Sequence, residues 1–390
     1  MRPFPSHATA FAARIGAKHP IVLAPMLAHT TPRLCAAAAN AGVVAFEGAG
    51  QLGKDVLVSR IRETQAMVNA GAVFGVNLFV PSGFYTDPSS WTEPQAAAVE
   101  VARERYEGYL RELSGEAAGT AAPSLSREEH QAVFSGQVDA LLETGVKLVS
   151  FHFGWPDAAE AGRLREAGAT LQGCATTVEE ARWLVDQGAD AIIAQGAEAG
   201  GHRGTFIDAQ DYRRALVEVV PLVRGIADAV DVPVIAAGGI MRGGDIRAVL
   251  EAGASAAQLG TAFLSCPECG TSAMHREALL GYGGEGRDAS DPLPTVVTLG
   301  YTGKPARGLQ TDRALRMADL EGALPNCFNG MLAGRTLQAA ALKQGRKDAA
   351  YLWAGSGYAR SRAMPAAALV ETLVAEAQSS QCTRVSNISQ

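Results

Sequence analysis

The chain has 390 residues, enough for one large domain with an additional piece, and its 47% hydrophobic and 19% charged residues are typical of a globular protein. The formal net charge is −6 and the basic residues are scattered, which argues against nucleic-acid binding. No apolar run reaches the roughly 18 residues of a membrane helix, and the N-terminus lacks the apolar segment of a signal peptide, so we expect a cytoplasmic protein without membrane contact.

Eight short apolar runs follow one another along the chain, separated by stretches with helical spacing. We expect strands at residues 21–26, 43–48, 73–80, 148–154, 170–175, 191–196, 232–240 and 256–263. Near-continuous apolar strands are typical of a sheet that is covered on both faces.

Amphipathic helices are predicted between most of these strands. Residues 31–42 follow the first strand, residues 177–189 the fifth and residues 243–254 the seventh, and each segment ends near a glycine. Strands that alternate with helices indicate parallel βαβ units, and eight of them predict an α/β fold of the (β/α)₈ TIM-barrel type. An open doubly wound sheet is the alternative. The strand count and the lack of GxGxxG after the first strand weigh against it.

Two segments are too long for the simple repeat. Residues 82–145 form an extended excursion between the third and fourth strands, with helices expected at 93–114 and 126–144. Residues 264–376 are predicted to form a mostly helical cap over the barrel formed by residues 1–263. Helices are expected there near 271–280, 312–323, 329–344 and 363–377. Residues 377–390 form a polar tail.

Six cysteines are spread along the chain, at positions 35, 174, 266, 269, 327 and 382. Reduced thiols are the default in a cytoplasmic protein. Cys266 and Cys269 form a CPEC pair, but a second CxxC pair and a histidine ligand pattern are missing, so we expect neither a zinc site nor a redox pair. No metal site is expected elsewhere, because the central histidines lack carboxylates at ligand spacing.

In a TIM barrel the chemistry lies at the carboxyl ends of the strands, and here those ends are rich in Gly, Gln, Asn and His. The seventh and eighth strands end in AAGGI and QLGT, containing Gly238, Gly239 and residues 258–261. Glycines before a helix N-terminus let backbone N–H groups approach a ligand, which favours a phosphate site. Glycines of ordinary tight turns are the alternative interpretation.

The strongest catalytic candidate is His202, in the segment QGAEAGGHRGTF that follows the sixth strand. Gly200 and Gly201 precede it and free the backbone for a ligand, and Gln195 ends the strand. Imidazole titrates near working pH, which suits a general base. His152, in SFHFGWP, is the second candidate and either lines the cavity or packs structurally.

Three further polar groups mark the strand ends. Asn77 lies inside an apolar strand and needs hydrogen-bond partners, which a polar heterocycle could supply. His29 follows the first strand, and Glu47 lies at the end of the second. The residues alone therefore predict a phosphate-anchored ligand, a polar ring bound by amides and a histidine base. Serine-protease, zincin and Walker motifs are missing.

At this point the sequence resembles the nitronate monooxygenases, also called 2-nitropropane dioxygenases, and most closely the class with the FHFG motif. The matching segments run from about residue 20 to residue 310 and are specific by their joint order. They are PIVLAPM, TPRLCAAAANAG, GVNLFVP, SFHFGWP, QGAEAGGHRGTF, PVIAAGGI, QLGTAFL and YTGKPARGL.

The resemblance implies a barrel with FMN at its mouth and a helical domain over it. The residues implied to hold FMN are Ala24, Pro25, Met26, Asn77, Gln195, Gly200, Gly201, Gly238, Gly239, Gln258, Leu259, Gly260 and Thr261. His202 matches the catalytic histidine of the family, and His152 the FHFG histidine beside the substrate. Tyr301 and Lys304 are implied, more weakly, to border the substrate or the flavin phosphate.

The implied reaction converts an alkyl nitronate, or a nitroalkane deprotonated by His202, and O₂ to a carbonyl compound and nitrite. The sequence departs from the family after APM, where Ala28, His29 and Thr30 replace a Gly-Gly stretch, and at Phe46 and Glu47. We expect His29 and Glu47 either to alter the polarity of the pocket or to pair with each other.

Three alternatives stay open. They are an NAD(P)H-dependent FMN reductase of the same superfamily, of the enoyl-thioester reductase type, a flavin-free phosphate-binding isomerase or lyase barrel, and a flavin-binding protein without activity. The sequence predicts small-molecule partners only and leaves the oligomeric state open, with a homodimer among the options.

Overall fold

The computed structural model describes residues 2–84, 88–114, 126–207, 209–281, 293–325 and 333–379. The polar tail predicted at residues 377–390 lies outside these ranges from residue 380 onward, as do Cys327 and Cys382. Within the described ranges, no helix is both long enough and apolar enough to cross a membrane.

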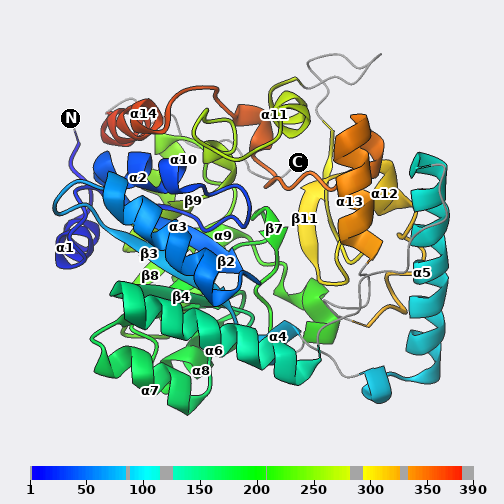
Figure 1. Cartoon of the computed structure of the whole chain (residues 1–390). Helices are drawn as coiled ribbons and strands as arrows, with labels where there is room; N and C mark the ends of the chain where they lie inside the picture. Colours follow the sequence, from blue (N-terminus) through cyan, green and yellow to red (C-terminus); the bar gives the residue numbers. More distant parts are fainter. Residues whose placement is uncertain are drawn as a thin grey trace.

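Eight parallel strands close into a barrel, which confirms the predicted TIM-barrel fold (Figure 1). Each strand pairs with the next one along the barrel, and β9 closes the ring on β1. The strands are β1 Ile21–Leu23, β2 Val44–Gly50, β3 Phe74–Phe79, β4 Leu148–His152, β5 Thr170–Ala175, β6 Ala191–Gln195, β8 Val234–Ala237 and β9 Ala256–Leu259. All eight fall within or close to the predicted apolar runs, because both faces of every strand are covered.

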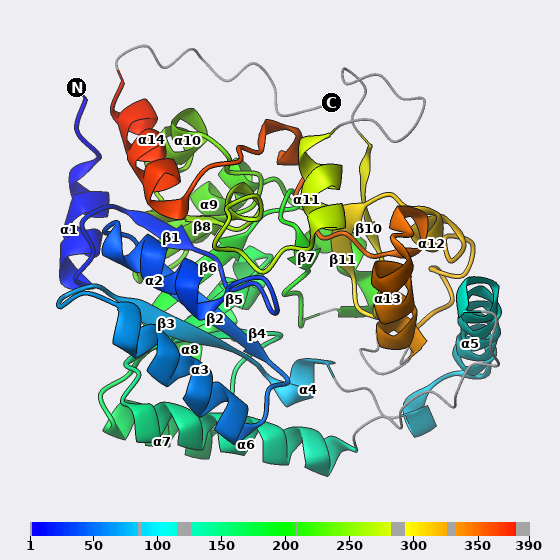
Figure 2. The ribbon, with the colours of Figure 1, turned by 45° about the horizontal axis from the view of Figure 1, so that its top comes forward.

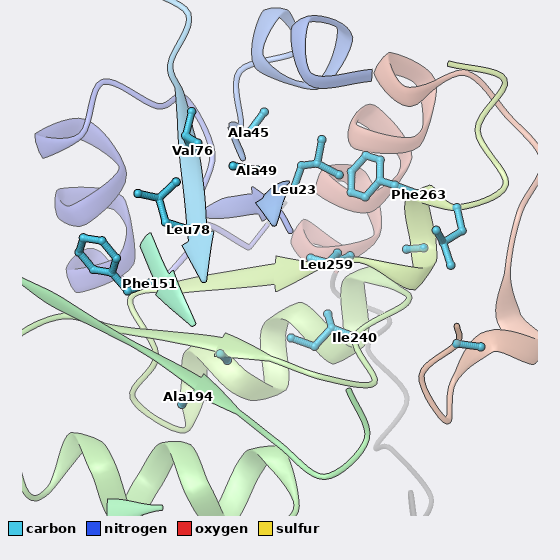
Figure 3. Packing of buried hydrophobic residues seen from close by; sticks show 14 of the residues in the cluster. Leu23, Ala45, Ala49, Val76, Leu78, Phe151, Ala194, Ile240, Leu259 and Phe263 are labelled. Carbon is cyan, nitrogen blue, oxygen red and sulfur yellow. The ribbon is translucent and has the colours of Figure 1, made fainter. Parts of the chain in front are cut away.

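The strands divide their side chains between two apolar layers. Leu23, Val76 and Leu78 point outward into the layer between barrel and helices (Figure 3). Val22, Phe46 and Ile193 belong instead to a second cluster inside the barrel. Phe11 of α1 (Ser6–Arg14) joins this inner cluster, so the first helix contributes to the packing inside the barrel. Because side chains alternate along a strand, the residue that follows an outward one, such as Asn77 after Val76, faces inward.

An outer layer of helices surrounds the barrel (Figure 2). These helices are α2 Pro32–Asn40, α3 Lys54–Met67, α6 Arg127–Thr144, α7 Ala158–Glu166, α8 Val178–Asp186, α9 Val219–Ala227, α10 Gly243–Glu251 and α14 Ala366–Gln378.

Local capping explains where the predicted helices begin and end. The hydroxyls of Thr31 and Thr177 accept hydrogen bonds from the third residue of α2 and α8, a contribution of about 1 kcal/mol each. Gly42, Gly188 and Gly253 follow α2, α8 and α10 with φ of 91°, 91° and 112°. This left-handed backbone favours glycine and stops the helix, as the sequence predicted.

The region expected to form a mostly helical cap also contains a sheet. β10 (Thr295–Thr298) and β11 (Ala306–Leu309) pair antiparallel, and β11 pairs with β7 (Gly201–His202), which leaves the barrel after β6. Around this sheet lie the helices α11 Ala273–Leu280, α12 Asp312–Leu315 and α13 Ala333–Gln344. The expected helix at 312–323 is therefore shorter, because turns follow Leu315.

Two helices are not where the linear division into barrel and cap would put them. α5 (Glu93–Ser114), from the β3–β4 excursion, packs against α13 of the cap region (Figure 1). α14 packs against α10 and α2, and the backbone of Ala377 lies against Gly243 at the start of α10. We therefore propose that α14 belongs to the barrel and α5 to the cap.

The short elements complete the described chain. They are α4 Pro81–Phe84, η1 Pro88–Ser90, η2 Ala209–Ala215, η3 Thr261–Phe263, η5 Lys347–Ala349 and η6 Tyr358–Arg360.

Candidate active site

A cavity of about 580 Å³ opens at the carboxyl ends of the barrel strands, beneath the β7–β10–β11 sheet. Its lining comes from two sources, the strand ends and the cap region. Of the residues predicted to form the site, those that line it are Ala24, Pro25, Met26, His29, Asn77, His152, Gln195, Gly200, Gly201, His202, Gly238, Gly239, Gln258, Gly260, Thr261 and Tyr301. Residues far apart in the sequence thus meet in one space.

Three predicted residues are not among the lining residues. Leu259 points its side chain into the layer outside the barrel, so it can contribute only through its backbone. Glu47 is fully buried and accepts hydrogen bonds from Thr64 and Arg60 of α3, behind β2. It does not pair with His29, and burial raises its pKa. The sequence interpretation of Glu47 as a pocket residue fails, because its strand position faces the helices.

The third such residue is Lys304, which is buried beside the site. Its Nζ lies 5.7 Å from the centre of the Phe153 ring. Its positive charge helps to lower the pKa values of His152 and His202. Lys304 therefore acts on the site through its charge rather than as part of the cavity wall.

His202 lies on β7, where backbone pairing with β11 places it opposite Ala306. Its Nε2 is 2.9 Å from the hydroxyl oxygen of Thr302. Burial lowers the pKa of His202 to about 3, assisted by His152 and Lys304, so the imidazole is neutral at working pH.

Aromatic rings surround this imidazole. The ring centres of Trp353, Phe153 and Phe79 lie 5.4, 5.9 and 6.2 Å from that of His202. Phe153, in the FHFG segment, has φ of 70°, a conformation that costs a non-glycine residue about 1 kcal/mol or more. These rings shield part of the imidazole from water, and the resulting desolvation is the largest cause of the depressed pKa of His202.

His152 and Gln195 both contact the backbone of the His202 segment. The Nε2 atoms of both side chains lie within hydrogen-bond distance of the carbonyl oxygen of His202, at 3.2 and 2.9 Å. Gln195 Oε1 also accepts from the N–H of Gly204 at 2.8 Å. Burial lowers the pKa of His152 to about 4.

Tyr301 lines the cavity with its ring, but its hydroxyl is directed away. That hydroxyl donates to the carbonyl of Leu309, and burial raises its pKa to about 12. The ring packs edge-on against Trp353 at 5.3 Å. Tyr301 thus shapes the wall and offers no proton donor to a ligand.

His29 lines the opposite side of the cavity. Its Nδ1 is 3.4 Å from the Thr271 hydroxyl, and its ring meets that of His275 at 5.4 Å. Burial lowers the pKa of His29 to about 4. Nearby Cys266 and Cys269 are free buried thiols whose pKa is raised by burial. Among the described residues, no cluster of three or more His, Cys, Asp or Glu is placed to hold a metal.

Glycine backbone forms the rim where a phosphate was expected. Gly238 and Gly239 have φ of 120° and 69°, which favours glycine at both positions. A Cβ on Gly239 would lie 2.9 Å from Glu198 Cβ, and one on Gly200 2.6 Å from the backbone of Ala354. These positions leave room only for glycine and keep the backbone open to a ligand.

Two amides of the barrel interior complete this side. Asn77 Nδ2 donates to the carbonyl and hydroxyl of Ser150, at 3.2 and 2.9 Å, which leaves its carbonyl oxygen for another donor. Gln258 is 8% exposed, and its Oε1 has no hydrogen-bond partner. An unpaired buried oxygen at a cavity wall fits a ligand that donates a hydrogen bond.

Sequence reasoning missed the wall that the cap region supplies. Thr302, Tyr351, Trp353, Gly355 and Gly357 all line the cavity. The segment WAGSG at 353–357 carries a glycine signal, but it lies between predicted cap helices far from any barrel strand. Long-range contacts with Gly200, Thr261 and Gly308 bring it to the site.

A closed parallel barrel with a neutral histidine, glycine backbone and free amide oxygens at its mouth defines a barrel enzyme that binds its ligand at the strand ends. The family model "Nitronate monooxygenase" matches residues 9–376, and the chain belongs to that family. It is therefore an oxidoreductase enzyme of the nitronate monooxygenase family.

Relatives and solved structures agree. The chain is 40% identical to a nitronate monooxygenase of Pseudomonas aeruginosa over 375 residues, 94% of this chain and 98% of the relative. It is 33% identical to a probable nitronate monooxygenase of Staphylococcus saprophyticus over 369 residues, 93% and 96% of the two chains. A nitroalkane oxidase structure from Streptomyces ansochromogenes is 37% identical with a TM-score of 0.81 and covers 94% of this chain and 97% of its own. FabK from Thermotoga maritima, at 24% identity and a TM-score of 0.67 over 96% and 97%, shares the fold.

Proposed function

We propose that this chain binds FMN at the barrel mouth and oxidises alkyl nitronates with O₂ to carbonyl compounds and nitrite, with His202 as the base for neutral nitroalkanes. The observation that carries the proposal is the neutral, half-buried His202 beside Thr302 in a cavity rimmed by glycine backbone. Family membership supports the nitronate chemistry in general.

The residues present fit FMN. The backbone of Gly238, Gly239 and residues 259–261 would take the phosphate, since glycine backbone presents N–H groups to an anion. Asn77 and Gln258 offer free amide oxygens to donors of the ring system or the ribityl chain. Residues 24–26 would lie along the ring. When bound, FMN supplies the electron transfer between nitronate and O₂.

The charge state of the site favours the nitronate anion. Lys304 carries a positive charge beside the two histidines, and the lining residues in the described part of the chain include no carboxylate. Neutral imidazole N–H or the Thr302 hydroxyl can donate to the nitro oxygens. Atoms and charge balance when two nitronate anions and one O₂ give two carbonyl compounds and two nitrite ions.

Neutral nitroalkanes should react more slowly than their anions. His202 must first take a proton from the carbon, and an imidazole whose pKa is lowered to about 3 holds that proton weakly. Proton transfer is therefore unfavourable unless ligand binding raises this pKa.

The test is an anaerobic visible spectrum of the purified protein before and after addition of propyl-2-nitronate, with NADPH in a parallel cuvette. We expect a yellow protein that is reduced by nitronate and not by NADPH, and that releases nitrite when O₂ is admitted. Bleaching by NADPH alone would indicate a reductase. A colourless protein that FMN does not restore would indicate a flavin-free barrel enzyme, and a yellow protein inert to both reagents a binding protein without activity.

A further inference from the structure

Two strands converge on one backbone atom next to the reacting centre. The carbonyl oxygen of His202 lies 2.9 Å from Nε2 of Gln195, at the end of β6, and 3.2 Å from Nε2 of His152, at the end of β4. A carbonyl oxygen only accepts hydrogen bonds, so both side chains must donate to it. His152 is therefore held as the tautomer with its proton on Nε2.

Gln195 extends this contact along the segment. Its Oε1 accepts from the N–H of Gly204 at 2.8 Å, so one amide spans residues 202–204. Gly204 has no space for a side chain, because a Cβ would lie 2.7 Å from Cys174 Sγ and 3.0 Å from His152 Cε1. The segment thus packs directly onto the barrel interior.

The other side of the segment is held by the cap sheet. The N–H of Arg203 donates to the carbonyl of Pro305 at 2.8 Å, and His202 Nε2 meets the Thr302 hydroxyl at 2.9 Å. With the backbone fixed on both sides, the direction of the His202 ring depends on where its carbonyl is held.

We propose that Gln195 and His152 form a carbonyl clamp, meaning the pair of donors to the carbonyl oxygen of His202, and that they are positioning residues for the His202 imidazole. This inference rests on the proposed function, in which His202 faces the substrate. Both side chains act through His202: the proton of His152 is engaged with the carbonyl, and so is one N–H of Gln195.

A clamp has different consequences from direct ligand contact. If Gln195 served mainly to bind the flavin ring, its loss would lower FMN affinity. Loss of a clamp donor instead leaves FMN bound and lowers kcat, since a displacement near 1 Å of a reacting group costs on the order of 100-fold in rate. It also admits water to His202, whose surrounding charged and titratable groups are His152 from β4, Lys304 from the β10–β11 turn and the neighbouring Arg203.

The main experiment compares His152→Phe, which keeps a ring without a donor, with His152→Gln, whose Nε2 reaches a similar position. We expect His152→Phe to retain FMN, to lose roughly 10- to 100-fold in kcat with propyl-2-nitronate and to change KM by less than about threefold. His152→Gln should recover most of the loss. Equal kcat in His152→Phe and wild type, or equal losses in both variants, would overturn the clamp.

A second measurement does not depend on turnover. The titration of the His202 imidazole can be followed by NMR, with the signal assigned by its loss in His202→Asn. In Gln195→Met, which leaves the charge of His152 in place, its pKa should rise from about 3 toward the ordinary 6.5 as water reaches the ring. An unchanged titration would contradict the inference even if the wild type failed to oxidise nitronates, an outcome that would sink only the proposed function.

Gln195→Met and the double variant complete the test. Two donors to one carbonyl are coupled, so the loss in Gln195→Met/His152→Phe should be well below the product of the single losses. If the two losses in kcat multiply, the two residues act separately. The same follows if Gln195→Met releases FMN but regains the wild-type kcat when FMN is added back.

Discussion

The two walls of the cavity come from regions of the chain with different kinds of sequence signal. The barrel wall consists of strand ends, such as Asn77 and Gln258, that follow apolar runs recognisable one by one. The cap wall consists of Thr302 and residues from 351 to 357, which reach the site through the pairing of β11 with β7 and through long-range contacts such as that of Gly355 with Thr261. The barrel wall thus offers polar amides, glycine backbone and the rings of Phe79 and Phe153, whereas the cap wall adds Thr302 and the ring of Trp353 beside the His202 imidazole.

The two walls should therefore have different roles. The barrel wall should govern binding of the cofactor, and the cap wall should govern the environment of the base. Substitutions confined to one wall test this division of roles.

The largest effect is expected from His202→Asn, at the junction of the two walls. FMN should remain bound, while kcat with nitroethane falls by roughly 10²- to 10⁴-fold, the usual contribution of a general base. Turnover of propyl-2-nitronate should fall less, because the anion needs no deprotonation. Steady-state kinetics with both substrates measure the difference.

The exposed His7→Asn is the matched control and should leave both rates unchanged. If His202→Asn turned over nitroethane as fast as the wild type, the assignment of the base would be wrong.

A second prediction concerns the buried histidines that line or flank both walls. Burial lowers the pKa of His29 and His152 to about 4 and of His202 and His275 to about 3, against 6.5 when exposed. The unfolded chain therefore binds more protons than the folded chain below pH 6.5, and the fold loses stability as the pH falls through this window. Each histidine contributes about 1.4 kcal/mol per pH unit there.

Urea unfolding of the FMN-free protein at about pH 7.5 and about pH 5.5 should thus reveal a loss of several kcal/mol, summed over the four histidines. His275→Gln should make the pH dependence shallower. The same pH dependence in His275→Gln and in wild type would contradict burial as the cause.

The barrel wall could be predicted from the sequence better than the cap wall. Strands that are covered on both faces appear as near-continuous apolar runs, so Asn77, Gln195 and Gln258 could be placed on the barrel strands from those runs alone. Glu47 was misplaced because a strand presents alternate residues to opposite faces, and which parity faces inward depends on the register of the whole barrel.

The cap wall could not be predicted in this way. Its pairing joins residues far apart in the sequence. Within β11, Ala306 pairs with His202, about a hundred positions earlier, and Gly308 pairs with Trp353, about 45 positions later, and no local pattern encodes such partners. Strands of four residues also give a weak local signal, which is why β10 and β11 were not predicted between the helices expected near 271–280 and 312–323.

The contact between the walls can be tested directly at Gly200. In Gly200→Ala a Cβ would lie 2.6 Å from the backbone of Ala354 and Gly355, so the cap segment must shift. We expect a destabilisation of roughly 1–3 kcal/mol, as for overpacking, together with loss of activity. Urea unfolding and nitronate kinetics measure both effects.

Gly201→Ala is the matched comparison, because it lies next to Gly200 with φ of 77° and has nothing within 4 Å of its Cβ position. Only backbone strain is expected there, about 1 kcal/mol. Equal effects of the two substitutions would mean that contact between the walls contributes little.

The smallest effect is expected in the loop after β1, where Ala28, His29 and Thr30 depart from the glycine-rich pattern of the family. Ala28 has φ of 66°, so the backbone keeps a left-handed conformation that alanine adopts at a cost of about 1–2 kcal/mol. Ala28→Gly removes that strain, but the greater backbone freedom of glycine lowers the free energy of the unfolded chain by about 0.5–1 kcal/mol. The net gain should be a few tenths to about 1 kcal/mol in urea unfolding.

Ala37→Gly, inside α2 with ordinary helical backbone, is the control and should instead lose about 1 kcal/mol. Opposite signs for the two substitutions would mean that the loop retains a glycine-like backbone without its glycine. In that case the departure from the family pattern lies in the His29 side chain that the loop directs to the cavity, and not in the path of the chain. If Ala28→Gly and Ala37→Gly both lose stability, the loop of this chain differs from the family pattern in its backbone conformation.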